Sequence, residues 1–107
     1  MKVFWSATAV GHLAAIREYI SQTSPFYAER MVQRVLDRAP QLGVFPESGR
    51  MVPELGRPEI REVVEGPFRV IYQLGPERVD VLAVVHGRRS TLGLNPEPGS
   101  GDDSSAT

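Results

Sequence analysis

The chain contains no cysteine, two histidines and a single lysine among its 107 residues. Without cysteine it can form neither a disulfide framework nor a thiolate metal site, and the widely separated His12 and His86 argue against a structural metal centre. No segment approaches the roughly 20 consecutive apolar residues that cross a bilayer. The first ten residues also lack the longer apolar run of a signal peptide. We therefore expect a cytoplasmic protein with no metal, no cofactor and no membrane partner.

The charge is close to balanced, but it is unevenly distributed along the chain. Three acidic residues lie in the C-terminal tail, so residues 1–94 hold 12 basic and 13 minus 3, or 10, acidic side chains. This small excess is weak grounds for bulk attraction to nucleic acid. Eleven of the 12 basic residues are arginine, whose planar fork of donors suits phosphate and carboxylate. The codon bias of a GC-rich genome explains that ratio equally well.

Two amphipathic helices are predicted after a short first strand at residues 2–5. Ser6 can cap a helix over residues 7–22, in which apolar residues recur at helical spacing. Ser24 followed by proline opens a second helix, because proline is tolerated at the first helical position. The short linker makes the two helices an antiparallel hairpin. Pro40 should kink or end the second helix near its last turn.

The second half of the chain predicts a loop and then three strands. Residues 43–58 carry three prolines and three glycines without clear periodicity, which is typical of a long loop. Alternating patterns follow in residues 59–66, 67–74 and 77–87, separated by turn-prone Gly-Pro pairs. Tyr72 shares the apolar face of the middle strand, so it is interpreted as a core residue whose hydroxyl finds a partner at the rim.

The last strand is predicted to be central, because both of its faces are apolar. Strict alternation assigns its apolar residues to two faces: Val79, Val81, Ala83 and Val85 on one, Leu82 and Val84 on the other. The element order β-α-α-β-β-β predicts one α+β domain over residues 1–94, with a helical hairpin packed on one face of a mostly antiparallel sheet. The opposite face is expected to be bare. Residues 95–107 are expected to form a disordered acidic tail.

Five basic side chains are the candidate functional residues, since all lie on the last three strands or just beyond them: Arg61, Arg69, His86, Arg88 and Arg89. If Arg69 and His86 share a face, a guanidinium lies beside an imidazole, and this pair can hold a phosphate and transfer a proton near neutral pH. Strand register decides this, and the sequence does not give it. The structural alternative is that arginines decorate the sheet edges and that His86 is a satisfied polar residue at the strand exit.

Five motifs occur in order along the chain: W-S-x-x-A at 5–9, L-x-x-I-x-x-Y-I at 13–20, P-E-S-G-R at 46–50, an arginine followed by P-F-R-V-I-Y within 61–72, and V-x-H-G-R-R at 84–89. Together they resemble the RelE/ParE superfamily of bacterial toxins from type II toxin–antitoxin modules. The resemblance covers residues 2–90, and the tail matches nothing in the pattern. It implies a growth-arresting toxin that a cognate antitoxin, ParD-like or similar, holds inactive.

The resemblance also implies a choice between two targets. RelE-like members cleave mRNA on the ribosome, and Arg61, Arg69 and His86 would then be the catalytic residues. ParE-like members inhibit DNA gyrase without catalysis, and the same residues with Arg88 and Arg89 would bind the target or the antitoxin. No tyrosine follows His86 and no lysine follows Lys2 in this chain, which departs from the nuclease pattern. The H-G-R-R ending favours the gyrase inhibitor. A degenerate member that only binds its antitoxin is a third hypothesis.

Overall fold

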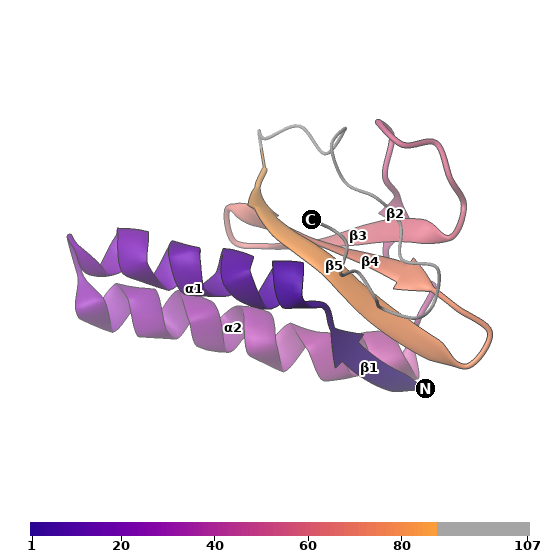
Figure 1. Ribbon diagram of the computed structural model, residues 1–107, viewed down its shortest axis with the longest axis horizontal. Coiled ribbons are helices and arrows are strands. Elements are labelled where there is room, and N and C mark those ends of the chain that lie inside the picture. Colours follow the sequence, from indigo (N-terminus) through magenta and orange to yellow (C-terminus); the bar gives the residue numbers. More distant parts are fainter. Residues whose placement is uncertain (88–107) are drawn as a thin grey trace.

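The computed structural model describes residues 1–87, which form a two-layer α+β fold in the order β-α-α-β-β-β-β. Its elements are β1 (Lys2–Trp5), α1 (Ala7–Ser21), α2 (Pro25–Val44), β2 (Arg50–Met51), β3 (Ile60–Glu65), β4 (Phe68–Leu74) and β5 (Arg78–His86). The two helices lie on one side of the sheet and extend beyond its end (Figure 1). The predicted architecture is confirmed. The predicted tail lies outside the described residues, as do Arg88 and Arg89.

The five strands form one sheet in the order β1-β5-β4-β3-β2. β1 runs parallel to β5, and the other neighbours are antiparallel. β5 thus has a neighbouring strand on each side, which confirms the prediction that the last strand lies inside the sheet and not at its edge. β2 lies inside the segment predicted to be a loop and pairs with Glu62 and Arg61 of β3. A strand of two residues is too short to produce an alternating pattern, so that prediction missed it.

Both predicted helix caps are confirmed, and of the two outcomes predicted at Pro40, a kink or an end, the structure excludes an end at that residue. The hydroxyls of Ser6 and Ser24 accept hydrogen bonds from Ala9 N at 3.0 Å and from Tyr27 N at 3.1 Å. α2 continues through Pro40 to Val44. Proline removes one backbone donor, and burial of Leu42 and Gly43 holds the last turn in place.

A β-bulge reverses the predicted faces of the second half of β5. Ile71 lies opposite Ala83, whereas the next residue of β4, Tyr72, lies opposite Val81, so Leu82 is an extra residue in the ladder. Val79, Val81 and Val84 consequently pack on the helix side, and Leu82 and Ala83 pack on the other side. The strict alternation predicted for this strand is wrong beyond Leu82.

The sheet has an apolar core on each side. On the side that faces α1 and α2, which we call the helix face, the core includes Met31, Leu42, Val70 and Tyr72. On the other side, which we call the loop face, Ile71, Leu82 and Ala83 pack under the segment between β2 and β3, through Val52 and Leu55. That segment rises from the sheet opposite the helices (Figure 1). The expectation of a bare face is wrong, because the segment between β2 and β3 covers the face of the sheet that no helix covers.

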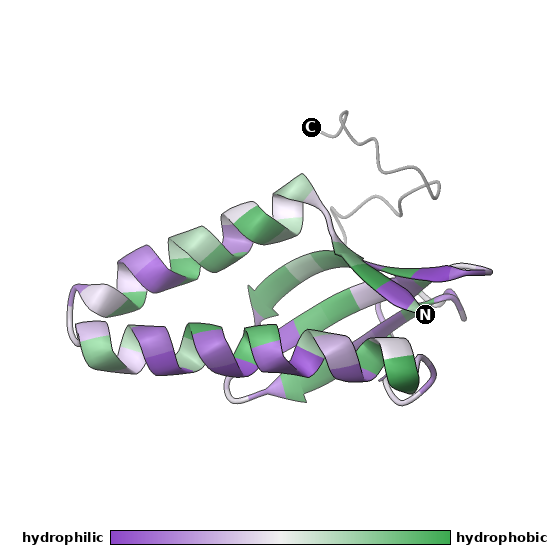
Figure 2. Ribbon diagram, turned by 90° about the horizontal axis from the view of Figure 1, so that it is seen from below, coloured by the Kyte–Doolittle hydropathy of each residue, from purple (hydrophilic) through white to green (hydrophobic). Residues whose placement is uncertain are grey.

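Hydropathy follows this arrangement along the helices. α2 alternates hydrophilic and hydrophobic bands, with the hydrophobic ones turned toward the sheet (Figure 2). Among residues 1–87, no helix is long and apolar enough to cross a membrane.

Candidate functional site

Arg69 lies on the loop face and is held by two carboxylates of the same chain. Its Nε and Nη2 contact Oε1 of Glu62 at 2.6 and 2.5 Å, and its Nη1 and Nη2 each contact Glu54 at 3.0 Å. Glu62 is fully buried and also accepts a hydrogen bond from Arg50 Nε at 2.6 Å. Hydrogen bonding to Glu54 raises the pKa of Arg69, and burial opposes this shift only in part. Only 7% of Arg69 is exposed, so it is not a bare guanidinium.

Arg61 lies on the helix face, because it stands opposite Tyr72 in the sheet. Its Nη1 donates to the carbonyl of Gly49 at 2.8 Å. The buried Tyr72 hydroxyl accepts from Gly49 N at 3.0 Å and donates to the carbonyl of Pro46 at 2.8 Å. Burial raises the pKa of this phenol. The partner expected for the Tyr72 hydroxyl is thereby found, and Arg61 and Tyr72 together fasten the P-E-S-G-R segment to the sheet.

The glycine of that segment is required by close packing. A Cβ atom on Gly49 would lie 2.5 Å from the carbonyl oxygen of Glu62 and 2.6 Å from the Tyr72 hydroxyl. Either contact is shorter than non-bonded atoms tolerate. The glycine of the P-E-S-G-R motif is therefore explained by the close approach of the backbone to Glu62 and Tyr72 just before β2 begins.

His86 lies at the end of β5, away from both arginines. It stands opposite Phe68, and the two rings meet edge to face with centroids 6.1 Å apart. Arg69 stands opposite Val85, so Arg69 and His86 point to opposite faces of the sheet. Arg61 shares the face of His86 but is offset along the sheet by four residues of β4, or about 13 Å. The three described candidate residues are thus not brought together.

His86 instead lines a groove of about 790 Å³ between α1 and the ends of β4 and β5. Ile16 and Tyr19 of α1 line it from one side, and Phe68 lines it from the other. Tyr19 is 76% exposed although it is a large aromatic residue. Contiguous exposed apolar surface of this kind marks a site of interaction.

The groove also lies beside an uncovered stretch of strand edge. β1 pairs with β5 only from Arg78 to Val81, and the chain then turns away into α1. His12 of α1 partly caps the edge, because its Nδ1 accepts a hydrogen bond from Val84 N at 3.2 Å. Sequence reasoning did not assign His12 to a site. Its position one turn before Ile16 and two turns before Tyr19, on the same face of the helix, is the signal that could have done so.

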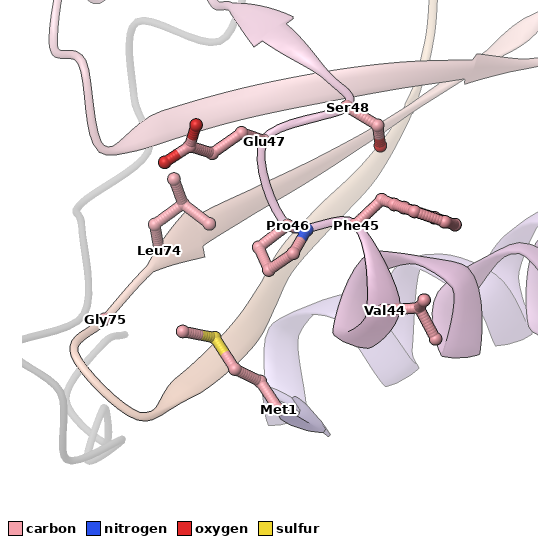
Figure 3. A pocket seen from close by; sticks show the side chains of 8 residues that line it. All are labelled: Met1, Val44, Phe45, Pro46, Glu47, Ser48, Leu74 and Gly75. Carbon is pink, nitrogen blue, oxygen red and sulfur yellow. The ribbon is translucent and has the colours of Figure 1, made fainter.

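A second pocket of about 590 Å³ lies at the other end of the molecule. It forms where residues 44–48 meet Met1 and the end of β4 (Figure 3). Glu47 is the ionisable side chain labelled in its lining, and none of the candidate residues lines it. Among residues 1–87, no three acidic, histidine or cysteine side chains are grouped so that they could hold a metal ion.

Comparison with known proteins agrees with this fold. The sequence profile of the family described as "ParE toxin of type II toxin-antitoxin system, parDE" matches residues 3–91. A curated relative named Toxin RelE2, from Caulobacter vibrioides, is 36% identical over 89 residues, which are 82% of this chain and 97% of the relative. A solved structure described as a chromosomal ParDE TA system from P. aeruginosa matches with a TM-score of 0.68 at 21% identity, over 80% of this chain and 95% of that one.

The two-layer fold and the profile match define the class of protein: a toxin of a type II toxin–antitoxin system. Within that class, the chain belongs to the ParE toxin family. The superfamily resemblance read from the sequence motifs is thereby confirmed.

Proposed function

We propose that this toxin arrests growth in the cytoplasm by inhibiting DNA gyrase without catalysis, and that a cognate antitoxin neutralises it. The observation that supports this most directly is that Arg69 is paired with two carboxylates and lies on the other face of the sheet from His86. Its guanidinium contacts Glu54 and Glu62 on the loop face, while His86 lies on the helix face. A nuclease that used this pair would need both groups at one phosphate. Their separation favours a protein that acts by binding.

The groove between α1 and the end of β5 is the proposed antitoxin site. It offers the exposed ring of Tyr19 beside the half-buried Ile16, and the edge of β5 beside it ends at His86. A helical or extended acidic segment that folds as it binds would fill such a groove with its apolar side chains. Its carboxylates could pair with basic residues at the end of β5, where Arg88 and Arg89 follow in the sequence.

A ribosome-dependent endoribonuclease is the second candidate function. The specific observation in its favour is the name of the curated relative, RelE2, at 36% identity. In this alternative Arg61 and Arg69 bind the scissile phosphate and His86 transfers a proton. It requires Arg69 to leave both carboxylates and the three residues to converge.

One pair of assays separates the two functions. Purified toxin is titrated into gyrase with relaxed plasmid, and into a translating extract whose transcripts are mapped by primer extension. We expect supercoiling to stop, or cleaved plasmid to accumulate, while the transcripts stay intact. Added antitoxin should restore supercoiling. An indifferent gyrase together with cleavage in the ribosomal A site would overturn the proposal.

The groove assignment has its own test. Tyr19→Glu places a carboxylate at the groove, and it should weaken antitoxin binding at least tenfold, because a central aromatic contact is lost and like charges meet. Phe45→Glu is the matched control, since Phe45 is an exposed aromatic residue at the other pocket. Titration calorimetry with the antitoxin checks both. Equal losses in the two variants would place the antitoxin elsewhere.

A further inference from the structure

The arginines of the described chain differ in how well carboxylates neutralise them. Three of them each pair with an acid of their own: Arg17 with Glu29, Arg57 with Glu59 and Arg78 with Asp80. Two more, Arg50 and Arg69, share the carboxylates of Glu62 and Glu54. In these places the positive charge is matched by an equal number of carboxylates.

The remaining four lie together along one side of the molecule. Arg30, Arg34 and Arg38 occupy one face of α2 at intervals of four residues. Arg61 lies on the same face of β3 as Glu65, which pairs with Arg34 and Arg38. Arg38 and Arg61 also share a neighbour, because both of their charges oppose the rise in the pKa of the Tyr72 phenol. We call these four residues the guanidinium ridge.

The ridge has one carboxylate for its four cations. Glu65 pairs with both Arg34, at 3.0 Å, and Arg38, at 3.8 Å. Within residues 1–87, Arg30 and Arg61 take part in no ion pair. Asp37 stands at the margin of the ridge, where its Oδ1 accepts a hydrogen bond from Gln33 at 2.8 Å. Even with Asp37 included, the ridge has an excess of about two positive charges, and Arg30 and Arg34 are exposed while Arg38 and Arg61 are half-buried.

Aromatic side chains are interleaved with these cations. The Arg30 guanidinium lies over the Phe26 ring, 5.9 Å from its centroid. Tyr27, which is half exposed, lies on the same face of α2, one turn before Arg30 and two turns before Arg34. Arginine guanidiniums and tyrosine hydroxyls are both donors that proteins use to contact the phosphates of duplex DNA.

We propose that the guanidinium ridge binds the phosphate backbone of duplex DNA. From Arg30 to Arg38 the helix rises about 12 Å, so its three guanidiniums are spread over a length that a few neighbouring phosphates of one strand can match. An interface for a folded protein would have an apolar centre with charges at its rim, and the ridge has cations along its centre. The choice of duplex DNA over RNA rests on the proposed function, because gyrase holds duplex DNA.

The ridge and the antitoxin groove lie on different sides of the helical hairpin. The groove is lined by α1 and by the ends of β4 and β5, whereas the ridge is formed by α2 and β3. None of the four ridge arginines lines the groove. Three phosphate contacts, one from each ridge arginine of α2, would give a slope of log affinity against log salt of about −2.7, and non-specific dissociation constants of about 10⁻⁴ to 10⁻⁶ M.

The test measures binding of the full chain to a fluorescein-labelled 20-base-pair duplex by anisotropy, without gyrase, at a series of salt concentrations. The ridge variant combines Arg30→Gln, Arg34→Gln and Arg38→Gln. The control variant makes the same change of charge at Arg17, Arg57 and Arg78, which have carboxylate partners of their own. We expect the ridge variant to lose at least tenfold in affinity and most of the salt slope. The control should stay within about threefold of the unmodified chain.

Thermal unfolding verifies that both variants fold, and the remaining outcomes decide against the proposal. Equal losses in the ridge and control variants would mean that net charge alone governs binding. Unchanged DNA binding in a ridge variant that no longer binds antitoxin would make the ridge a protein contact. Tighter binding to single-stranded RNA of equal length would overturn the choice of DNA. Because gyrase is absent, a failure of gyrase inhibition leaves this measurement standing.

Discussion

The two faces of the sheet are closed by different means. On the helix face, two helices of 15 and 20 residues cover the core with apolar side chains such as Met31 and Leu42. On the loop face, a short segment covers Ile71 and Leu82 with only two apolar residues, and a network of arginines and carboxylates fastens it to the sheet. A small domain can therefore seal a second core with few residues, provided that buried charges replace some of the apolar area.

This difference predicts where the molecule is vulnerable. An apolar core loses stability in proportion to the cavity that a substitution leaves. A buried ionic network fails when one partner is removed, because the other charge is left desolvated. Variants on each face can test whether the two mechanisms operate as the contacts indicate.

The largest expected effect is at the centre of the network. Glu62 is fully buried between Arg50 and Arg69, so Glu62→Ala leaves Arg69 with Glu54 as its remaining partner in this network. We expect the free energy of unfolding to fall by about 3–5 kcal/mol, the usual cost of breaking a buried pair. Urea denaturation followed by circular dichroism measures it. The double variant Glu62→Leu with Arg69→Met should cost much less, and an equal cost would refute the electrostatic explanation.

The next effect compares the two apolar cores directly. Leu42 and Ile71 are both completely buried, the first on the helix face and the second on the loop face. Leu42→Ala should cost about 4 kcal/mol, whereas Ile71→Ala should cost about 2 kcal/mol, because a loop can relax into a cavity and a packed helix cannot. The same denaturation experiment provides both values. Equal costs would remove the distinction between the faces.

The helix face was also the more predictable of the two. Both helix starts followed from serine caps and Pro25, and the helical hairpin followed from helical spacing and the short linker. The cover of the loop face could not be predicted. Val52 and Leu55 sit among prolines and glycines without periodicity, and the ion pairs of Glu54 depend on how the chain folds back over the sheet.

The candidate site was predictable in its parts but not in its arrangement. Arg61, Arg69 and His86 do lie on the last three strands, as their sequence positions indicated. The bulge at Leu82 then shifts the end of β5 by one residue, and a shift of one residue exchanges the two faces. No local pattern in a strand that is apolar on both faces reveals such a bulge. Pairing register therefore decided which candidate residues meet.

A smaller effect is expected at the boundary between sheet and loop on the helix face. Tyr72→Phe removes the hydroxyl that bonds Gly49 N and the Pro46 carbonyl, and we expect a loss of about 1–3 kcal/mol because these buried groups lose a partner. The variant also tests the pH dependence. Because the pKa of Tyr72 is raised above its ordinary value of 10.0, its contribution is complete below pH 10 and is lost as the pH rises further. The difference in stability between the two proteins should therefore shrink above pH 10. If the difference in stability stayed constant above pH 10, the pH dependence would not come from the Tyr72 hydroxyl.

The smallest effect probes how the loop is held. Glu54 is partly exposed, so Glu54→Gln should lower global stability by about 1 kcal/mol or less. Its local effect should be larger, because Glu54 connects the loop to Arg69 while Leu55 and Gly56 N bond only the nearby Val52 carbonyl. Amide hydrogen exchange at Leu55 and Gly56 should therefore accelerate severalfold, while amides of Val70 in the shared sheet keep their protection.

Glu59→Gln is the matched control for that experiment. Glu59 pairs with Arg57 inside the same loop and does not connect the loop to the sheet through that pair. If both substitutions accelerate exchange equally, charge within the loop holds it in place, and the Glu54–Arg69 contact has no special role. If neither does, Val52 and Leu55 hold the cover by apolar packing alone, and the two faces of the sheet are closed in the same way after all.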